Sequence, residues 1–150
     1  MIHELEKMCL QKNFDKRKAR QIINQIDINQ VFKDSYFALD TTLLTCATEE
    51  ANYDMVELLL KNGANPNLVY GEKYSEENAL WDLQYSSEDE ETDKIRLEIV
   101  KLLLENGANP HINVDGEDLY HWATACWQDD MGMQAEYRSR FIDLLEDFDS

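Results

Sequence analysis

The side chains in this sequence with the clearest potential for chemistry lie in its last third. His121 precedes Cys126 by five residues and the pair Asp129-Asp130 by eight. A histidine beside a thiol or carboxylates can bind a metal ion or form a nucleophile and base pair. On a helix, however, side chains five positions apart do not share a face, because neighbours on one face are three or four residues apart. We therefore interpret His121 as structural, and we expect no metal ion and no other cofactor.

A second chemically suggestive group is the acidic run of residues 88–93, which reads Glu-Asp-Glu-Glu-Thr-Asp. Clustered carboxylates can bind calcium, but this run lacks the alternating oxygen ligands and the central glycine of an EF-hand loop. Its charges repel one another, and it has no apolar anchor. We predict a solvated loop between two helices. The alternative that the insertion 85–96 docks a basic partner stays open.

The remaining chemistry-bearing residues indicate no reaction. The sequence has no glycine-rich phosphate loop, no nucleophile elbow and no zinc-ligand spacing. Neighbouring carboxylates such as Glu49-Glu50 are common in so acidic a chain and do not indicate acid/base catalysis. The cysteines Cys9, Cys46 and Cys126 are odd in number and lack a Cys-x-x-Cys spacing, which favours reduced, packed thiols in a cytoplasmic protein.

Composition narrows the fold and the partners. The 150 residues are 43% hydrophobic with 5 Gly and 2 Pro, which favours helices joined by few tight turns. The net charge of −17 disfavours nucleic acid and anionic membranes as partners and favours a basic protein. Residues 1–33 differ, with seven basic and four acidic side chains. No basic leader and no run of roughly 20 apolar residues is present, so we expect a soluble, cytoplasmic protein.

An internal repeat determines the expected architecture. Residues 56–67 and 100–111 are identical at nine of twelve positions, and each copy contains Leu-Leu-Leu followed by Asn-Gly-Ala-Asn-Pro. The apolar positions cover more than half of a helix circumference, so each helix must be buried on two sides. Gly63 and Gly107 follow the helices, and we predict a positive φ at both. Such helices are typical of a stacked array, whose units cannot bury their apolar surface alone.

These residues resemble the ankyrin-repeat family. The sequence Thr-Leu-Leu-Thr-Cys-Ala-Thr at residues 42–48, continued to Asn67, is similar to the family pattern that runs from Thr-Pro-Leu-His to Gly-Ala-Asp-x-Asn. The resemblance implies an all-α fold: an ankyrin-like helical repeat solenoid with short β-turn fingers. One domain, 1–150, would hold repeats at 1–33, 34–67, 68–111 and 112–150, the outer two degenerate. It also gives His121 a structural hydrogen bond at a helix start.

The chain departs from the family pattern in length. Gly63 and Gly107 are 44 residues apart, whereas ankyrin repeats span about 33. We place the extra residues after Asn67, in the insertion 85–96 and around 127–140.

The resemblance implies a non-catalytic protein-protein interaction module and a monomer. Ankyrin proteins bind partners on a concave face made of fingers and first helices, and tyrosines there offer contact area at little entropic cost. Such a small acidic binder would suit an inhibitor or a toxin-immunity protein. We predict the partner-binding residues Tyr36, Glu49, Tyr70, Tyr74, Glu77, Tyr85 and Glu117.

Two alternatives remain open. Aromatic residues near the fingers, namely Phe32, Phe37 and Trp81, can instead pack inward. The opposing functional hypothesis is an enzyme with an acid/base site in the long insertion of the third or fourth repeat, built from Asp129, Asp130 or His121.

Overall fold

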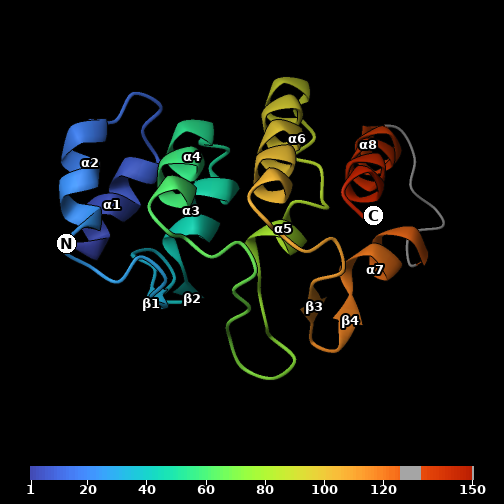
Figure 1. Cartoon of the computed structure of the whole chain (residues 1–150), viewed down its shortest axis with the longest axis horizontal. Coiled ribbons are helices and arrows are strands. Elements are labelled where there is room, and N and C mark those ends of the chain that lie inside the picture. Colours follow the sequence, from blue (N-terminus) through green and yellow to red (C-terminus); the bar gives the residue numbers. More distant parts are fainter. Residues whose placement is uncertain (126–132, 150) are drawn as a thin grey trace.

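The computed structural model describes residues 1–125 and 133–149, and these residues are mostly helical (Figure 1). The helices are α1 (Ile2–Cys9), α2 (Lys16–Ile23), α3 (Leu43–Glu49), α4 (Tyr53–Lys61), α5 (Ala79–Asp82), α6 (Glu90–Glu105), α7 (Leu119–Ala125) and α8 (Met133–Asp147). The strands are β1 (Phe32–Lys33), β2 (Asp40–Thr41), β3 (Asn113–Val114) and β4 (Glu117–Asp118). Each antiparallel pair, β1 with β2 and β3 with β4, forms the base of a hairpin.

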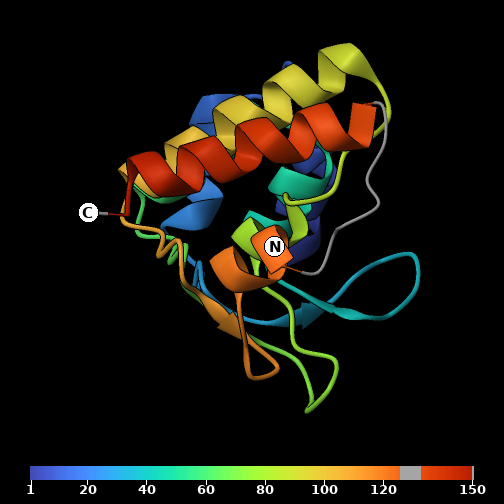
Figure 2. The same ribbon diagram turned by 90° about the vertical axis from the view of Figure 1, so that its right-hand side faces the viewer.

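The helices form two layers along the long axis of the molecule. In one layer α4 packs against α6 and α6 against α8; in the other, α1 packs against α3 and α3 against α5. Figure 1 shows the helices in successive pairs, with the two hairpins and the loop before α5 below them. Figure 2 shows that these loops project away from the helical layers. Buried apolar side chains from α1 to α8 join in one cluster that fills the space between the layers.

The repeated Leu-Leu-Leu helices are buried as the sequence predicts. In α4 the side chains of Met55, Val56 and Leu59 are fully buried, and the helix contacts both α3 and α6. Helices α4 and α6 end where a glycine follows the cap residue, and the φ angles are +99° at Gly63 and +94° at Gly107. The predicted positive φ is confirmed at both positions. Glycine suits these positions because it adopts a positive φ without the steric penalty of a Cβ atom.

Buried asparagines begin two of the helices and also tie neighbouring repeats together. The Asn52 side chain accepts a hydrogen bond from the backbone N–H of Met55 at the start of α4 and donates to the carbonyl of Cys9, 3.0 Å away, at the end of α1. Asn78 caps α5 and donates to the carbonyls of Pro66 and Leu68. An aspartate would cap as well but could not donate to these carbonyls, because an ionised carboxylate only accepts, whereas an amide accepts through its oxygen and donates through its nitrogen.

A ladder of asparagines joins the turns that end successive repeats. Asn29 donates to the carbonyl of Gly63 (3.2 Å) and accepts from the backbone N–H of Asn65 (2.8 Å). Asn67 makes the same pair of bonds one repeat later, to the carbonyl of Gly107 (2.9 Å) and from the N–H of Asn109 (2.7 Å). The turns at residues 27–29 and 65–67 therefore each fix the position of the corresponding turn that follows, at residues 63–65 and 107–109.

Where the next asparagine of the ladder would stand, the chain has His111. Its Nδ1 lies 3.0 Å from a carboxylate oxygen of Asp118, and its Nε2 lies 2.8 Å from one of Asp149, beyond α8. These two carboxylates raise the pKa of His111, first through the hydrogen bond to Asp149 and then through that to Asp118. The last rung of the ladder is thus an ionisable contact that holds the end of α8.

The prediction of a solvated loop at residues 88–93 is wrong for most of that run. Helix α6 already begins at Glu90, and Asp89 is its N-cap, accepting from the backbone N–H of Thr92. The side chain of Asp93 is 6% exposed and accepts hydrogen bonds from Ser86 and Ser87. Acidic residues stabilise a helix start because they cap its free N–H groups and interact with its dipole, so the charge run favours helix rather than loop.

Of the predicted insertion 85–96, residues 90–96 belong to α6, which has 16 residues, and residues 85–89 lie in the segment that joins it to α5, which has four. Of the predicted excess around 127–140, residues 133–140 belong to α8. Cys126, Asp129 and Asp130 lie outside the described residues. Within the part that the structure describes, no helix has the length and apolar character needed to cross a membrane.

Candidate protein-binding surface

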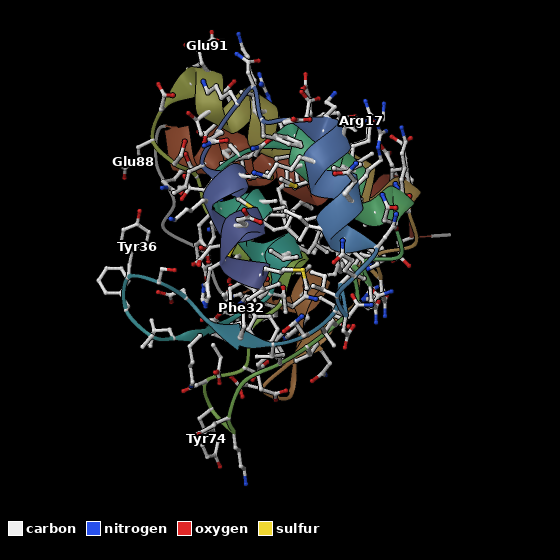
Figure 3. All side chains as sticks on the ribbon, turned by 90° about the vertical axis from the view of Figure 1, so that its left-hand side faces the viewer. Arg17, Phe32, Tyr36, Tyr74, Glu88 and Glu91 are labelled. Carbon is white, nitrogen blue, oxygen red and sulfur yellow. The ribbon has the colours of Figure 1, made fainter. Side chains whose placement is uncertain are left out.

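The loop between β1 and β2, residues 34–39, projects from the molecule and is called the first finger here. The carboxylate of Asp34 accepts hydrogen bonds from the backbone N–H groups of Tyr36 (2.9 Å), Phe37 (2.6 Å) and Leu39 (3.1 Å). Because these N–H groups turn inward to Asp34, the three side chains point outward. They are 74%, 80% and 62% exposed, in that order, and Figure 3 shows Tyr36 at the tip of the loop. Three large apolar side chains on one exposed loop are typical of an interaction surface.

A groove of about 350 Å³ separates the first finger from the helices beneath it. We call it the finger groove. Its walls come from α1, the first finger with β2, the end of α3 and one residue before α5, and its lining residues are Glu6, Cys9, Leu10, Asp34, Tyr36, Phe37, Leu39, Asp40, Thr41, Cys46, Glu49, Glu50 and Glu77. The groove therefore lies between the first finger and the helices α1 and α3.

Three carboxylates of the finger groove are occupied within the protein. Glu6 is buried and accepts from the backbone N–H and the hydroxyl of Ser35, so it fastens the first finger to α1. Burial would raise the pKa of Glu6, but hydrogen bonds from His3 and Ser35 together outweigh it and lower the pKa. Asp34 holds the finger backbone, and Asp40 pairs with Lys33 at 2.6 Å.

Two other carboxylates of the groove, Glu49 and Glu50 at the end of α3, stand free. Both are exposed, and neither makes a hydrogen bond or ion pair with any residue in 1–125 or 133–149. The pKa of Glu49 is raised, first because the surrounding protein displaces water and then because Glu77 and Glu50 repel its charge. A cation brought into the groove would relieve this repulsion.

The repulsion continues along the first helices to Asp82 on α5. Burial, followed by the charges of Glu77 and Glu49, raises the pKa of Asp82 to about 7, although the guanidinium of Arg96 opposes the shift. Arg96 itself donates to the backbone carbonyls of Asp82 (3.2 Å) and Tyr85 (2.9 Å). The side where first helices and fingers meet is thus a surface of crowded carboxylates with few compensating cations.

The loop at residues 71–76 forms a second finger, held against the hairpin of β3 and β4. The carboxylate of Asp115 accepts from the backbone N–H groups of Tyr74 (2.8 Å) and Glu76 (3.1 Å), and Asp115 N–H donates to the Glu76 side chain. Tyr74, at the tip, is 80% exposed.

Tyr70 does not offer contact area, contrary to the sequence prediction. Its backbone pairs with Glu77 across the base of the second finger, its hydroxyl donates to the Glu77 carboxylate at 3.2 Å, and only 7% of it is exposed. Burial raises the pKa of its phenol, followed by a smaller effect of the Glu77 charge. Tyr70 therefore supports the finger from within.

The other predicted site residues lie on several parts of this side of the molecule. Tyr36, Glu49 and Glu77 meet at the finger groove. Tyr85 is partly exposed after α5, with the guanidinium carbon of Arg138 6.0 Å from its ring centre, and Glu117 is exposed on β4. The sequence reasoning missed Leu10, Leu39 and the Asp82 carboxylate, and it left Phe37 open to inward packing.

Of the three aromatic residues that could pack inward, two do so at least in part and one does not. Phe32 is buried and packs edge-on to His3, and Trp81 is half-buried against Trp122, with ring centres 6.0 Å apart. Phe37, in contrast, is exposed. His121 is exposed too, and it is its backbone N–H that bonds to Asp118. The expected structural bond at this helix start is thus made by the main chain and an aspartate.

No group of three or more His, Cys, Asp or Glu side chains suited to a metal ion occurs in residues 1–125 and 133–149. The thiols of Cys9 and Cys46 line the finger groove, and burial raises the pKa of both, that of Cys46 to about 11. A thiol with a raised pKa is a poor nucleophile at neutral pH. These two cysteines therefore fit packing better than chemistry.

Comparison with known protein families gives a match for the segment that lies between the two fingers. A family model of the ankyrin repeat matches residues 40–70, which cover β2, α3, α4 and the turn after them. Residues 40–70 are therefore similar to one ankyrin repeat. A search of curated proteins found no match. The matched segment contains residues 42–67, whose sequence resembles the family pattern, and ankyrin repeats are generally protein-protein interaction modules.

Proposed function

We propose that this protein is a non-catalytic ankyrin-repeat binding module, a four-repeat solenoid that holds a basic protein partner on the side where fingers meet first helices. The observation that carries the proposal is the combination in the finger groove: exposed Tyr36, Phe37 and Leu39 beside the free carboxylates of Glu49 and Glu50. Exposed aromatic side chains supply desolvated contact area, while carboxylates select and steer a cationic partner.

The distribution of charge supports a basic partner. The chain carries 31 acidic and 14 basic side chains, and seven of the basic ones fall within residues 1–33. In Figure 3, Arg17 on the basic helix α2 lies on the opposite side of the molecule from Tyr36. Arg17 therefore lies away from the first finger, whereas the groove beside Tyr36 is lined by Glu49, Glu50 and Glu77, which attract lysine- and arginine-rich surfaces.

The proposed contact set keeps Tyr36, Glu49, Tyr74, Glu77, Tyr85 and Glu117 from the sequence prediction, adds Phe37 and Leu39, and moves Tyr70 to a supporting role. The enzyme hypothesis gains no observation: His121 is exposed at the start of α7, and its two predicted partners fall outside the described residues. An inhibitor or immunity protein is the form of this function that the small size and acidity favour. Loss of the purified partner's activity on binding would support that form.

The proposed surface can be tested once a partner is captured from a native cell lysate, identified by mass spectrometry and purified. We expect Tyr74→Ala to weaken binding by about 1–2 kcal/mol, since exposed aromatic anchors commonly contribute that much. The melting temperature should not fall, because the Tyr74 side chain is 80% exposed. A matched control is Val31→Ala, an exposed apolar residue outside the finger groove.

Salt provides the second readout. Binding should weaken as sodium chloride rises, because screening acts on the carboxylates that attract the partner. A dissociation constant that is equal in low and high salt, or a partner that docks on the outer helices α4, α6 and α8, would overturn the proposal.

A further inference from the structure

The finger groove has walls of two different kinds, and together they restrict what can enter it. One wall is the first finger, with the exposed side chains of Tyr36, Phe37 and Leu39. The opposite wall is the end of α3, with the free carboxylates of Glu49 and Glu50. An anionic or purely apolar occupant would leave these carboxylates desolvated and unpaired, at a substantial cost in free energy.

The chain fills the groove with no cation of its own. Among the described residues that line the groove, six are acidic, and none is a lysine or an arginine. Lys33 neutralises only Asp40 among these carboxylates, and Arg96 donates to the backbone carbonyls of Asp82 and Tyr85. The charge in the groove must therefore be matched from outside.

We propose that the finger groove is the docking site for an arginine side chain of the protein partner, held between the aromatic wall of the first finger and the carboxylates of Glu49 and Glu50. This inference rests on the proposed function and narrows it to one anchor residue. A guanidinium suits both walls at once, because it stacks on aromatic rings and donates to carboxylates through a planar fork. A lysine ammonium is a compact, strongly hydrated charge that uses the aromatic wall less well.

The raised pKa of Glu49 agrees with this occupant. In the free protein this pKa is raised first by the loss of water around Glu49 and then by the charges of Glu77 and Glu50, and an arriving cation relieves that repulsion. Glu77 is itself held by the Tyr70 hydroxyl, and the first finger is fixed by Asp34 and Glu6. The walls are thus positioned before binding, which lowers the entropic cost of forming the contact.

The test uses a capped tripeptide, acetyl-Ala-Arg-Ala-amide, titrated into the full-length ¹⁵N-labelled protein and followed by NMR. Its twins carry citrulline, the neutral isostere of arginine, or lysine in the central position. We expect arginine to shift the backbone signals of the first finger and of the end of α3, with a dissociation constant at least about fivefold lower than that of citrulline. Lysine should fall between the two.

Two variants localise the effect. Glu49→Gln with Glu50→Gln should weaken arginine binding at least about fivefold, whereas the control pair Glu98→Gln with Glu105→Gln, which removes equal charge from α6, should change it by less than about twofold. Phe37→Ser should weaken arginine more than lysine. Phe37 is 80% exposed, so this variant should fold normally.

Failure here is distinguishable from failure of the proposed function. If the peptides shift only signals around Tyr74, or if citrulline binds as well as arginine, the groove is not an arginine site, while a basic partner can still bind the fingers. If the purified partner binds the wild-type protein and is indifferent to Phe37→Ser and to the Glu49 and Glu50 variants, the inference is equally overturned. The salt and Tyr74→Ala measurements test the wider function independently.

Discussion

Replacement of Asn67 by alanine should measure how much the asparagine ladder contributes to the stability of the repeat array. The Asn67 side chain spans two repeats, donating to the carbonyl of Gly107 at 2.9 Å and accepting from the N–H of Asn109 at 2.7 Å. Each such bond contributes about 0.5–1.5 kcal/mol net, so losing both costs about 1–3 kcal/mol. Because Asn67 is half-buried and water can reach the two groups, the lower half of that range is expected.

The matched control is Asn62→Ala. Asn62 is also half-buried, but its side-chain bond to the carbonyl of Leu58 (2.8 Å) stays within one helix. We expect Asn67→Ala to lower the free energy of unfolding by at least about 0.5 kcal/mol more than Asn62→Ala, since one hydrogen bond more is lost. Urea-induced unfolding followed by far-UV circular dichroism measures both. Equal losses in the two variants would show that the ladder does not couple the repeats and would refute the reasoning.

Three further predictions concern the array. Gly63→Val and Gly107→Val should each cost at least about 1 kcal/mol, entirely from backbone strain, because open space surrounds both Cβ positions; unchanged thermal melting would contradict this. Asp93→Ala should cost about 1–3 kcal/mol in urea unfolding, since two serines lose their buried acceptor, and a loss near zero would restore the solvated-loop interpretation. NMR should give His111 a pKa above its ordinary value of about 6.5, falling on Asp149→Asn. The stabilisation from this contact should be complete below that ordinary value and be lost as the pH rises through the folded-state pKa.

The elements that follow from local chemistry could be predicted. The two Leu-Leu-Leu helices and the glycines that end them could be predicted because they depend only on the segment's own residues. These residues set the width of the apolar face and require a positive φ after the helix. The asparagine ladder could not be predicted, because its hydrogen bonds join residues about forty positions apart.

The acidic run at residues 88–93 shows a limit of reasoning from charge alone. Like charges repel one another in a loop, but Asp89 and the acidic residues after it are also well suited to the first turn of a helix. The structure uses Asp89 as a cap and buries Asp93 under hydrogen bonds from Ser86 and Ser87. A serine pair followed by an acidic run is a helix-start pattern that could have been recognised.

The binding surface depends on which side of a turn each aromatic ring occupies, and residue type does not determine that. Tyr70 and Tyr74 belong to the same loop, but Tyr70 pairs with Glu77 at the base and is buried, whereas the backbone of Tyr74 is held by Asp115 of the next hairpin and its ring is left exposed. In the first finger one carboxylate, Asp34, collects three N–H groups and so turns three apolar side chains outward. Alanine at Tyr70 should therefore lower stability and alter binding only indirectly, while alanine at Tyr74 should act on binding alone. That division of roles follows from hydrogen bonds at the finger bases, which no spacing rule in the sequence encodes.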